Sequence, residues 1–193
     1  EYYHKALKIY KAVLGENHPH TANSYNNIGV VYRKLGDYDK ALEYYNKALE
    51  IRKVVLGENH RDTAKSYNNI RVVYDDLGDY DKALEYYFKA LEIQKAVLGE
   101  KHPDTAMSYN NIGIVYYNLG DYDKALEFYN KDLEIIKEVL GEKHPSTANS
   151  YNNIGEVYSN LGDYDKALEF HNKALEIRKD ILGENHPHTA NSY

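Results

Sequence analysis

The feature that most constrains this chain is a short string, LGENHP or a near copy of it, that returns every 42 residues. It begins at Leu14, Leu56, Leu98, Leu140 and Leu182. A unit of this length is too small to bury its own apolar face, so repeated units bury that face against their neighbours. The period therefore predicts an array of stacked repeats rather than a single globule.

Each unit has the pattern of two helices joined by a tight turn. In one unit, the segments 21–35 and 38–56 flank Gly36 and Asp37. Apolar residues recur in the second segment at spacings of three, four and seven, as they do on one face of a helix. Asp37 suits the N-cap of that helix, and a glycine follows its last turn. We therefore expect an all-α fold of antiparallel helix pairs.

The units follow one another without a linker, so we interpret residues 1–193 as a single repeat array. Residues 1–18 correspond to the second helix of a truncated unit, and residues 187–193 to the start of a fifth unit. Four full units lie between them, at 19–60, 61–102, 103–144 and 145–186. Neither end has the atypical sequence of a capping repeat, which indicates a piece of a longer array.

A set of aromatic, aliphatic and small residues recurs in each unit and resembles the tetratricopeptide repeat. In the first full unit it comprises Tyr25, Ile28, Gly29, Tyr32, Gly36, Tyr38, Ala41, Tyr45 and Ala48. The paired asparagines and the HP-x-TA junction of the long unit are similar to the kinesin light chain subclass of that family. The resemblance implies a right-handed α-solenoid whose first helices line a concave, peptide-binding face. It identifies the scaffold and leaves the particular function open.

Composition argues against several classes of function. Without cysteine, the chain holds no disulfide framework, thiolate metal site or cysteine nucleophile. A net charge of −6 argues against binding to a nucleic-acid backbone, and no apolar run approaches the ~18 residues of a membrane span. The 22 tyrosines, with no tryptophan, are expected to fill the core. We therefore expect a cytoplasmic protein with no cofactor and with no nucleic-acid or membrane partner.

Two recurring polar patterns are better explained by helix ends than by chemistry. One histidine recurs per unit, at His18, His60, His102, His144 and His186. Equivalent residues of successive repeats lie about 10 Å apart, too far to share a metal whose ligands lie at ~2.0–2.3 Å. The paired aspartates, such as Asp37 and Asp39, stand where a helix N-terminus uses a cap and a negative charge. We therefore predict no metal site and no catalytic residue.

A pair of asparagines recurs in every first helix, at 26–27, 68–69, 110–111 and 152–153. Asparagine is a poor helix former, so its presence in each repeat needs a reason. A ladder of amides, with donors and acceptors, can pair with the backbone of an extended peptide. Hydrogen bonding between adjacent repeats explains the pair equally well. We predict that the groove residue is the first of each pair: Asn26, Asn68, Asn110 and Asn152.

The repeats diverge at a few positions on the helix face that carries the asparagines. Beyond each asparagine pair these positions hold Arg33, Asp75, Tyr117 and Ser159, then Lys34, Asp76, Asn118 and Asn160; before it they hold Asn23, Lys65, Met107 and Asn149. A modular recognition surface would show this divergence, and neutral drift at exposed sites would look similar. The candidate site therefore also includes Arg33, Lys34, Lys65 and Tyr117, whose three cations would favour acidic side chains.

These patterns predict a non-enzymatic scaffold that binds an extended peptide, with a preference for acidic residues at one end. Two alternatives stay open: a ligand-sensing array attached to a nucleotide-hydrolysing switch protein, and a structural module that assembles end to end. Some family members clamp a C-terminal carboxylate with a lysine. This chain has Asn26 at that position, so the carboxylate clamp is not expected.

Two residues break the repeat pattern at positions that should be buried. Arg71 replaces the glycine found at 29, 113 and 155, and Asp132 replaces the alanine found at 48, 90 and 174. A buried unpaired charge costs several kcal/mol. We expect Arg71 to reach water by extending along its stem, and Asp132 to find a donor on the following helix.

The outermost helices are expected to expose apolar faces. On the helix from Tyr2 to Leu14 this face would comprise Tyr3, Ala6, Leu7 and Tyr10. At the other end it would be the face of residues 167–182, beneath the stub 189–193. Because every internal junction joins the same two surfaces, such faces match one another. The sequence therefore predicts end-to-end self-association.

Overall fold

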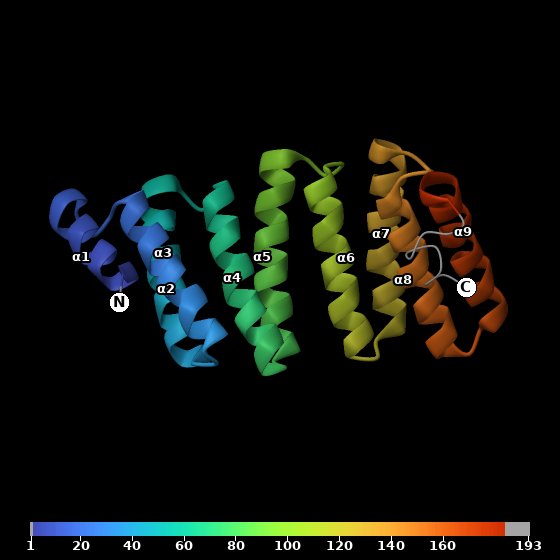
Figure 1. The fold of residues 1–193 in the computed structure, drawn as a ribbon, viewed down its shortest axis with the longest axis horizontal. Coiled ribbons are helices and arrows are strands. Elements are labelled where there is room, and N and C mark those ends of the chain that lie inside the picture. The colour runs from blue at the N-terminus through green and yellow to red at the C-terminus, as the bar shows by residue number, and fades with distance from the viewer. Residues whose placement is uncertain (1, 184–193) are drawn as a thin grey trace. The chain divides into compact units, whose positions relative to one another are not determined.

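The computed structural model describes residues 2–183, and over these residues the chain forms nine α-helices (Figure 1). They are α1 (Tyr2–Leu14), α2 (Pro19–Lys34), α3 (Tyr38–Leu56), α4 (Arg61–Leu77), α5 (Tyr80–Leu98), α6 (Pro103–Asn118), α7 (Tyr122–Leu140), α8 (Pro145–Leu161) and α9 (Tyr164–Leu182). The predicted all-α fold of helix–turn–helix repeats is confirmed. The predicted fifth unit at 187–193 and His186 lie outside the described residues.

Short turns join the two helices of each repeat, and capping explains where the second helix begins. The Asp37 carboxylate accepts a hydrogen bond from the backbone N–H of Lys40, as an N-cap does. Asp79, Asp121 and Asp163 cap α5, α7 and α9 in the same way. The glycine before each cap, such as Gly36, has a positive φ, here +77°, which a residue with a Cβ rarely adopts. The aspartate pairs therefore have the structural role that the sequence predicts.

The recurring LGENHP string forms the junction between repeats, and several of its residues make hydrogen bonds there. In the junction before α8, Gly141 ends α7 with a φ of +98°, and its carbonyl accepts a hydrogen bond from the Thr147 hydroxyl at 2.8 Å. The Glu142 carboxylate accepts one from the Tyr151 hydroxyl at 2.6 Å. His144 Nδ1 accepts one from the backbone N–H of residue 146 at 3.1 Å, which caps α8. The string therefore repeats because it fixes how one repeat enters the next.

The chain divides into two compact units, Glu1–Val97 and Leu98–Tyr193. In the first unit, one buried cluster joins α1, α2 and α3, and a second joins α3, α4 and α5. In the second unit, α7, α8 and α9 share a cluster built around Tyr129, Tyr151 and Ile154. Among the described residues, none of the helices is long and apolar enough to span a membrane.

Tyrosines fill the core of both units, as predicted. Tyr25 and Tyr67 are buried in the first unit and Tyr109 and Tyr151 in the second. Within a helix pair, the Tyr45 ring packs against the backbone of Gly29, where an added Cβ would lie 2.7 Å from the ring. Gly113 has the same relation to a tyrosine of α7. This contact explains why a glycine stands at that point of the repeat.

In the second repeat, Arg71 stands at the position of this glycine. The Arg71 guanidinium stacks over the Tyr87 ring, 4.2 Å from its centroid, and donates to the Tyr87 hydroxyl and to the Asp75 carboxylate. The expectation that Arg71 extends to water is therefore wrong, because an internal partner at 3.0 Å neutralises it instead. Two atoms of this group, Arg71 Nε and Asp75 Oδ1, are buried without a hydrogen-bond partner.

The first helix packs through a residue that was expected to be exposed. Leu7 is buried against α2 and α3, because the side chain faces the cluster around Tyr25. Tyr3 and Tyr10 are exposed as predicted, and Ile9 and Val13 are exposed more fully. The exposed apolar surface of α1 therefore keeps Tyr3 and Tyr10 of the predicted face, lacks Leu7, and extends to Ile9 and Val13.

Candidate functional site

A pocket of about 500 Å³ lies in the second unit, between the first helices α6 and α8 and above α7. It is lined by Pro103, Asp104, Met107, Asn110, Asp132, Ile136, Leu140, Ser146, Asn149, Ser150, Asn152, Asn153 and Arg178. The pocket brings together two of the predicted groove residues, Asn110 and Asn152. It also contains two of the variable positions, Met107 and Asn149.

The asparagine pairs form hydrogen bonds between adjacent repeats within each unit. In the first unit, Asn69 Nδ2 donates to Asn26 Oδ1 at 2.6 Å. In the second unit, Asn153 Nδ2 donates to Asn110 Oδ1 at 2.7 Å. The second asparagine of one repeat therefore donates to the first asparagine of the preceding repeat. Among the described residues, the amide N–H groups of Asn26 and Asn110 have no partner, so each keeps its donors after the inter-repeat bond has formed.

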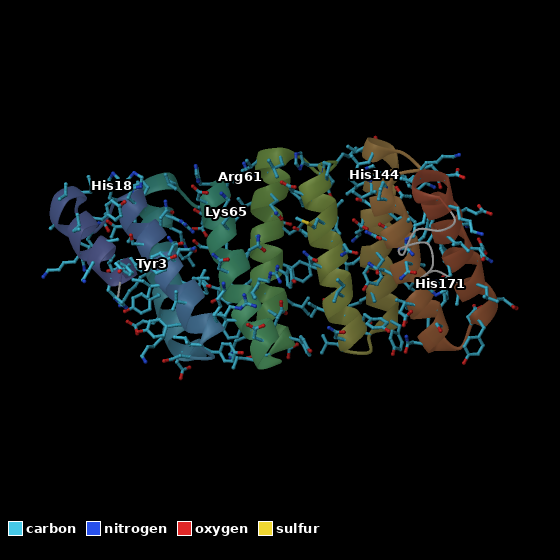
Figure 2. The ribbon with its side chains drawn as sticks, viewed as in Figure 1. Tyr3, His18, Arg61, Lys65, His144 and His171 are labelled. Carbon is cyan, nitrogen blue, oxygen red and sulfur yellow. The ribbon has the colours of Figure 1, made fainter. Side chains whose placement is uncertain are left out.

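The other two predicted groove asparagines have different surroundings. Asn68 is half-buried, and its side chain makes no hydrogen bond within residues 2–183. Asn152 Oδ1 lies 3.2 Å from His171 Nδ1, and His171 takes the place that Tyr45 and Tyr129 hold in other repeats. Figure 2 shows His171 on α9, the partner helix of α8.

Several variable positions pair with one another between successive repeats. The Arg33 guanidinium donates to both carboxylate oxygens of Asp76, at 2.6 and 3.3 Å. At the equivalent place in the second unit, Asn160 Nδ2 donates to the Tyr117 hydroxyl at 2.8 Å. The hydrogen bond to Asp76 raises the pKa of Arg33. Besides recognition and neutral drift, a third explanation therefore exists for the divergence at these positions: a change at one residue is matched by a change at the residue that it bonds in the next repeat.

The predicted basic end of the site is partly neutralised by the chain itself. Arg33 is paired with Asp76, and Lys65, at the start of α4 in Figure 2, lies 2.9 Å from a carboxylate oxygen of Asp62. Lys34 is exposed at the end of α2. Both paired cations are well solvated, and surface ion pairs of this kind contribute little energy. An acidic ligand would have to compete with Asp76 and Asp62 for them.

The sequence patterns do not reveal one polar contact deep between repeats. Arg52 of α3 is buried, with 6 % of its surface exposed, and its guanidinium bonds three groups. It donates to the Ser66 hydroxyl at 2.6 Å, to Asn23 Oδ1 at 2.9 Å and to the Asp62 carbonyl at 3.3 Å. Burial lowers the pKa of Arg52. Aligning the repeats shows that the position of Arg52 varies, because the other repeats hold Gln94, Ile136 and Arg178 there. This variation is the sequence signal that points to the Arg52 contact.

Asp132 finds a donor on the following helix, as predicted. The Ser150 hydroxyl of α8 donates to Asp132 Oδ2 at 2.5 Å. Asp132 is 4 % exposed, and its burial raises the pKa of the carboxyl to about 6. Ser150 is the counterpart of Ser66 in the first unit. Equivalent serines therefore have oppositely charged partners in the two units: Ser66 accepts from Arg52, and Ser150 donates to Asp132.

The histidines of the junctions are engaged at helix ends. Nδ1 of His18, His60 and His102 accepts the backbone N–H two residues later, as His144 does. Figure 2 places His18 and His144 at the entries of α2 and α8. Over residues 2–183, no three histidine or acidic side chains come together as a metal centre would require.

The fold and the sites together define a class: helical repeat proteins in which pairs of antiparallel helices stack into an α-solenoid. The family model described as tetratricopeptide repeat matches residues 1–53, 21–96, 72–135, 110–180 and 146–193, and so extends over the whole chain. The chain belongs to the tetratricopeptide repeat family, and its fold is similar to that of solved kinesin light chain-like repeats.

Solved structures agree with this assignment. BtubC (BKLC) from P. vanneervenii is 31% identical, with a TM-score of 0.76 over 88% of this chain and 68% of that one. A kinesin light chain-like protein of Podosopora anserina, with nearly identical TPR-like repeats, is 21% identical, with a TM-score of 0.80 over 93% of this chain and 85% of that one. The apo form of RapI is 27% identical, with a TM-score of 0.71 over 91% of this chain and 63% of that one. A comparison with curated protein sequences gives no match.

Proposed function

We propose that this chain is a non-enzymatic interaction scaffold that holds an extended peptide segment of a partner protein along its first helices. Its family consists of helical interaction scaffolds, which supports the general role. The peptide-binding mode is the finer part of the proposal. We also propose a cytoplasmic location and no nucleic-acid or membrane partner, on the composition argument alone.

One observation carries the proposal. The Asn110 amide uses its oxygen for the inter-repeat bond and keeps its donors at the pocket between α6 and α8. An amide donor held by its own acceptor bond is fixed in direction, which lowers the entropy cost of binding a peptide carbonyl. Asn152 lines the same pocket one repeat later. A peptide backbone across this pocket would meet polar groups from two successive repeats.

The proposal assigns no acidic preference to the first unit. Arg33 and Lys65 already have carboxylate partners, so an acidic peptide residue gains only what it takes from Asp76 or Asp62. Lys34 alone is a weak and solvated attraction. This changes the expectation drawn from the three cations in the sequence, and the proposal rests on the amides instead.

A matched pair of variants separates binding from structure. Peptides are selected from a random library on the full chain, and their affinities are measured by fluorescence anisotropy. Asn110→Ala removes the amide donors together with the inter-repeat bond, whereas Asn153→Ala removes the same bond and leaves the donors of Asn110. We expect micromolar binding that weakens about tenfold in Asn110→Ala and clearly less in Asn153→Ala, which loses the bond that fixes the amide but keeps the Asn110 donors.

The melting temperatures of the two variants provide the control. Both should fall by a similar amount, because both lose the one hydrogen bond between Asn110 and Asn153. If no library peptide is enriched, or if the two variants lose affinity equally, the asparagines are structural and peptide binding through them is excluded.

A further inference from the structure

The two units differ at one buried position, and the difference opens a pocket. In the first unit, the Arg52 guanidinium lies between α2 and α4, bonded to Asn23 and Ser66. In the second unit, the residues equivalent to these three are Ile136, Met107 and Ser150. All three line the 500 Å³ pocket. The pocket therefore lies where the first unit places its own cation.

The walls of this pocket have charges suited to a guest cation. Asp132, one helical turn before Ile136, lines it, and within the described residues its carboxyl receives a hydrogen bond only from Ser150. Asp104 lines it from α6. Arg178, from α9, is the one cation in the lining, and its Nη2 donates to Asn149 Oδ1 at 3.2 Å. The lining therefore includes two acidic residues and one guanidinium that already has a hydrogen-bond partner.

Keeping the Asp132 carboxyl ionised costs the folded state free energy. Burial penalises its ionised form, and a serine hydroxyl is a weak partner for a buried carboxylate. A positively charged group beside it would supply the missing partner through a charge-assisted hydrogen bond. Ser146, which also lines the pocket, is the counterpart of Asp62, whose carbonyl accepts from Arg52 in the first unit. The Ser146 carbonyl accepts from the Ser150 hydroxyl at 3.1 Å.

We propose that the pocket between α6, α7 and α8 binds the side chain of a lysine or arginine of a partner peptide, with its cationic group against Asp132. The geometry of Arg52 in the first unit is the internal precedent for that cation. This inference rests on the proposed function, since it names the residue class that the peptide inserts. A basic anchor is the opposite of the acidic preference expected from the sequence.

The single methionine of the chain offers a direct probe. Met107 lines the pocket, and the chain contains one methionine in all, so [13C]methyl-methionine labelling gives one methyl signal for the full chain. Acetyl-arginine amide, acetyl-lysine amide and the neutral acetyl-citrulline amide are titrated separately. We expect a saturable shift of the Met107 methyl signal with the two cations, at about millimolar affinity for so small a ligand, and no shift with citrulline.

Two variants report on the site itself. Asp132→Ala introduces the residue that three sibling repeats carry, so it preserves the fold, and it should abolish the response to arginine. Ile136→Arg introduces the residue found at 52 and 178, so the chain fills the pocket with its own guanidinium and the response should also disappear. An unchanged response in either variant, or an equal response to citrulline, would overturn the inference.

The outcomes for this inference and for peptide binding are distinguishable. If library peptides bind but their affinity depends neither on a basic residue nor on Asp132, the cation site is wrong while peptide binding stands. If no peptide binds but the Met107 signal responds to arginine and not to citrulline, the cation site stands without the proposed function. If no peptide binds and the Met107 signal does not respond, both the cation site and the proposed peptide binding are excluded.

Discussion

At the scale of single residues, Arg71 and Asp132 show two ways in which a repeat accommodates a charge at a position meant for a small side chain. Arg71 is neutralised by Asp75 on its own helix and stacks on Tyr87. Within the described residues, the Asp132 carboxylate has no oppositely charged partner, and it accepts its hydrogen bond from Ser150. The arginine is therefore internally compensated, whereas the aspartate is not.

The cost of ionised Asp132 predicts a pH-dependent effect of Asp132→Ala. The folded state raises the pKa of this carboxyl to about 6, against about 3.9 in the unfolded chain. Between these values the folded state binds more protons, so wild-type stability falls as the pH rises through the window. Asp132→Ala lacks this loss. Its free energy of unfolding relative to wild type should rise by on the order of 2 kcal/mol from about pH 4 to pH 7.

Urea unfolding of the two proteins at both pH values measures this difference, and all other titrating groups cancel because the proteins share them. A difference that does not change with pH would mean that Asp132 titrates in the folded protein as it does in the unfolded chain.

The sequence predicted that Asp132 has a donor on the following helix, and it left bonding between repeats open as one of two roles for the asparagines, without naming the atoms that pair. A serine recurs in every first helix, and an acid buried against that helix has few other donors to choose from. The Asn26 oxygen, in contrast, has its partner 43 residues away, and the period does not say which of two amides reaches across. The Arg52 contact was missed for a different reason: in the sequence, an arginine near a helix end resembles a solvated cation.

At the scale of elements, the junction histidines define where each first helix begins. His102 Nδ1 accepts the backbone N–H of Asp104 at 3.1 Å and leads into α6, whose second helix-forming residue would otherwise lack a partner. The period and the turn residues were enough to predict the helices. The predicted role of the junction histidines at a helix end is confirmed. The sequence did not show that the ring Nδ1 is the capping acceptor, because histidine is an uncommon N-cap beside serine, threonine, aspartate and asparagine.

Replacing this cap tests its role. His102→Leu should lower the free energy of unfolding by about 1 kcal/mol, and His102→Asn should restore most of it, since an asparagine oxygen can accept the same N–H. Thermal unfolding followed by circular dichroism compares the two variants with wild type. Equal losses in both would show that the ring contributes through packing rather than as an acceptor.

At the scale of the whole molecule, apolar residues remain on the outer helices of the described chain. On α1, Ile9 and Val13 are one turn apart and are 61 % and 73 % exposed. On α9, Leu168 is 61 % exposed, whereas its counterpart Leu84 in an earlier repeat is buried. Exposed apolar surface of this kind marks association sites.

These faces predict self-association through α1. Light scattering over a concentration series should show a mass that rises above 22.3 kDa and returns to it in the double variant Ile9→Lys and Val13→Lys. Val54→Lys is the matched control, because Val54 is equally exposed but lies on α3, inside the array. Leu7→Glu is unsuitable, since Leu7 belongs to the core. A constant mass at all concentrations would contradict end-to-end assembly.

The exchange of Arg52 for Ile136 has a consequence for how such arrays diversify. Shortening one side chain on a second helix converts a closed junction into an open one, while the helices on both sides keep their caps and their tyrosine packing. If the proposed cation site is right, a binding pocket has arisen where a large side chain of the core was replaced by smaller ones. The repeats hold Arg52, Gln94, Ile136 and Arg178 at this one position. Under the proposed cation site, the side chain at this position would decide which repeat admits a basic residue of a partner.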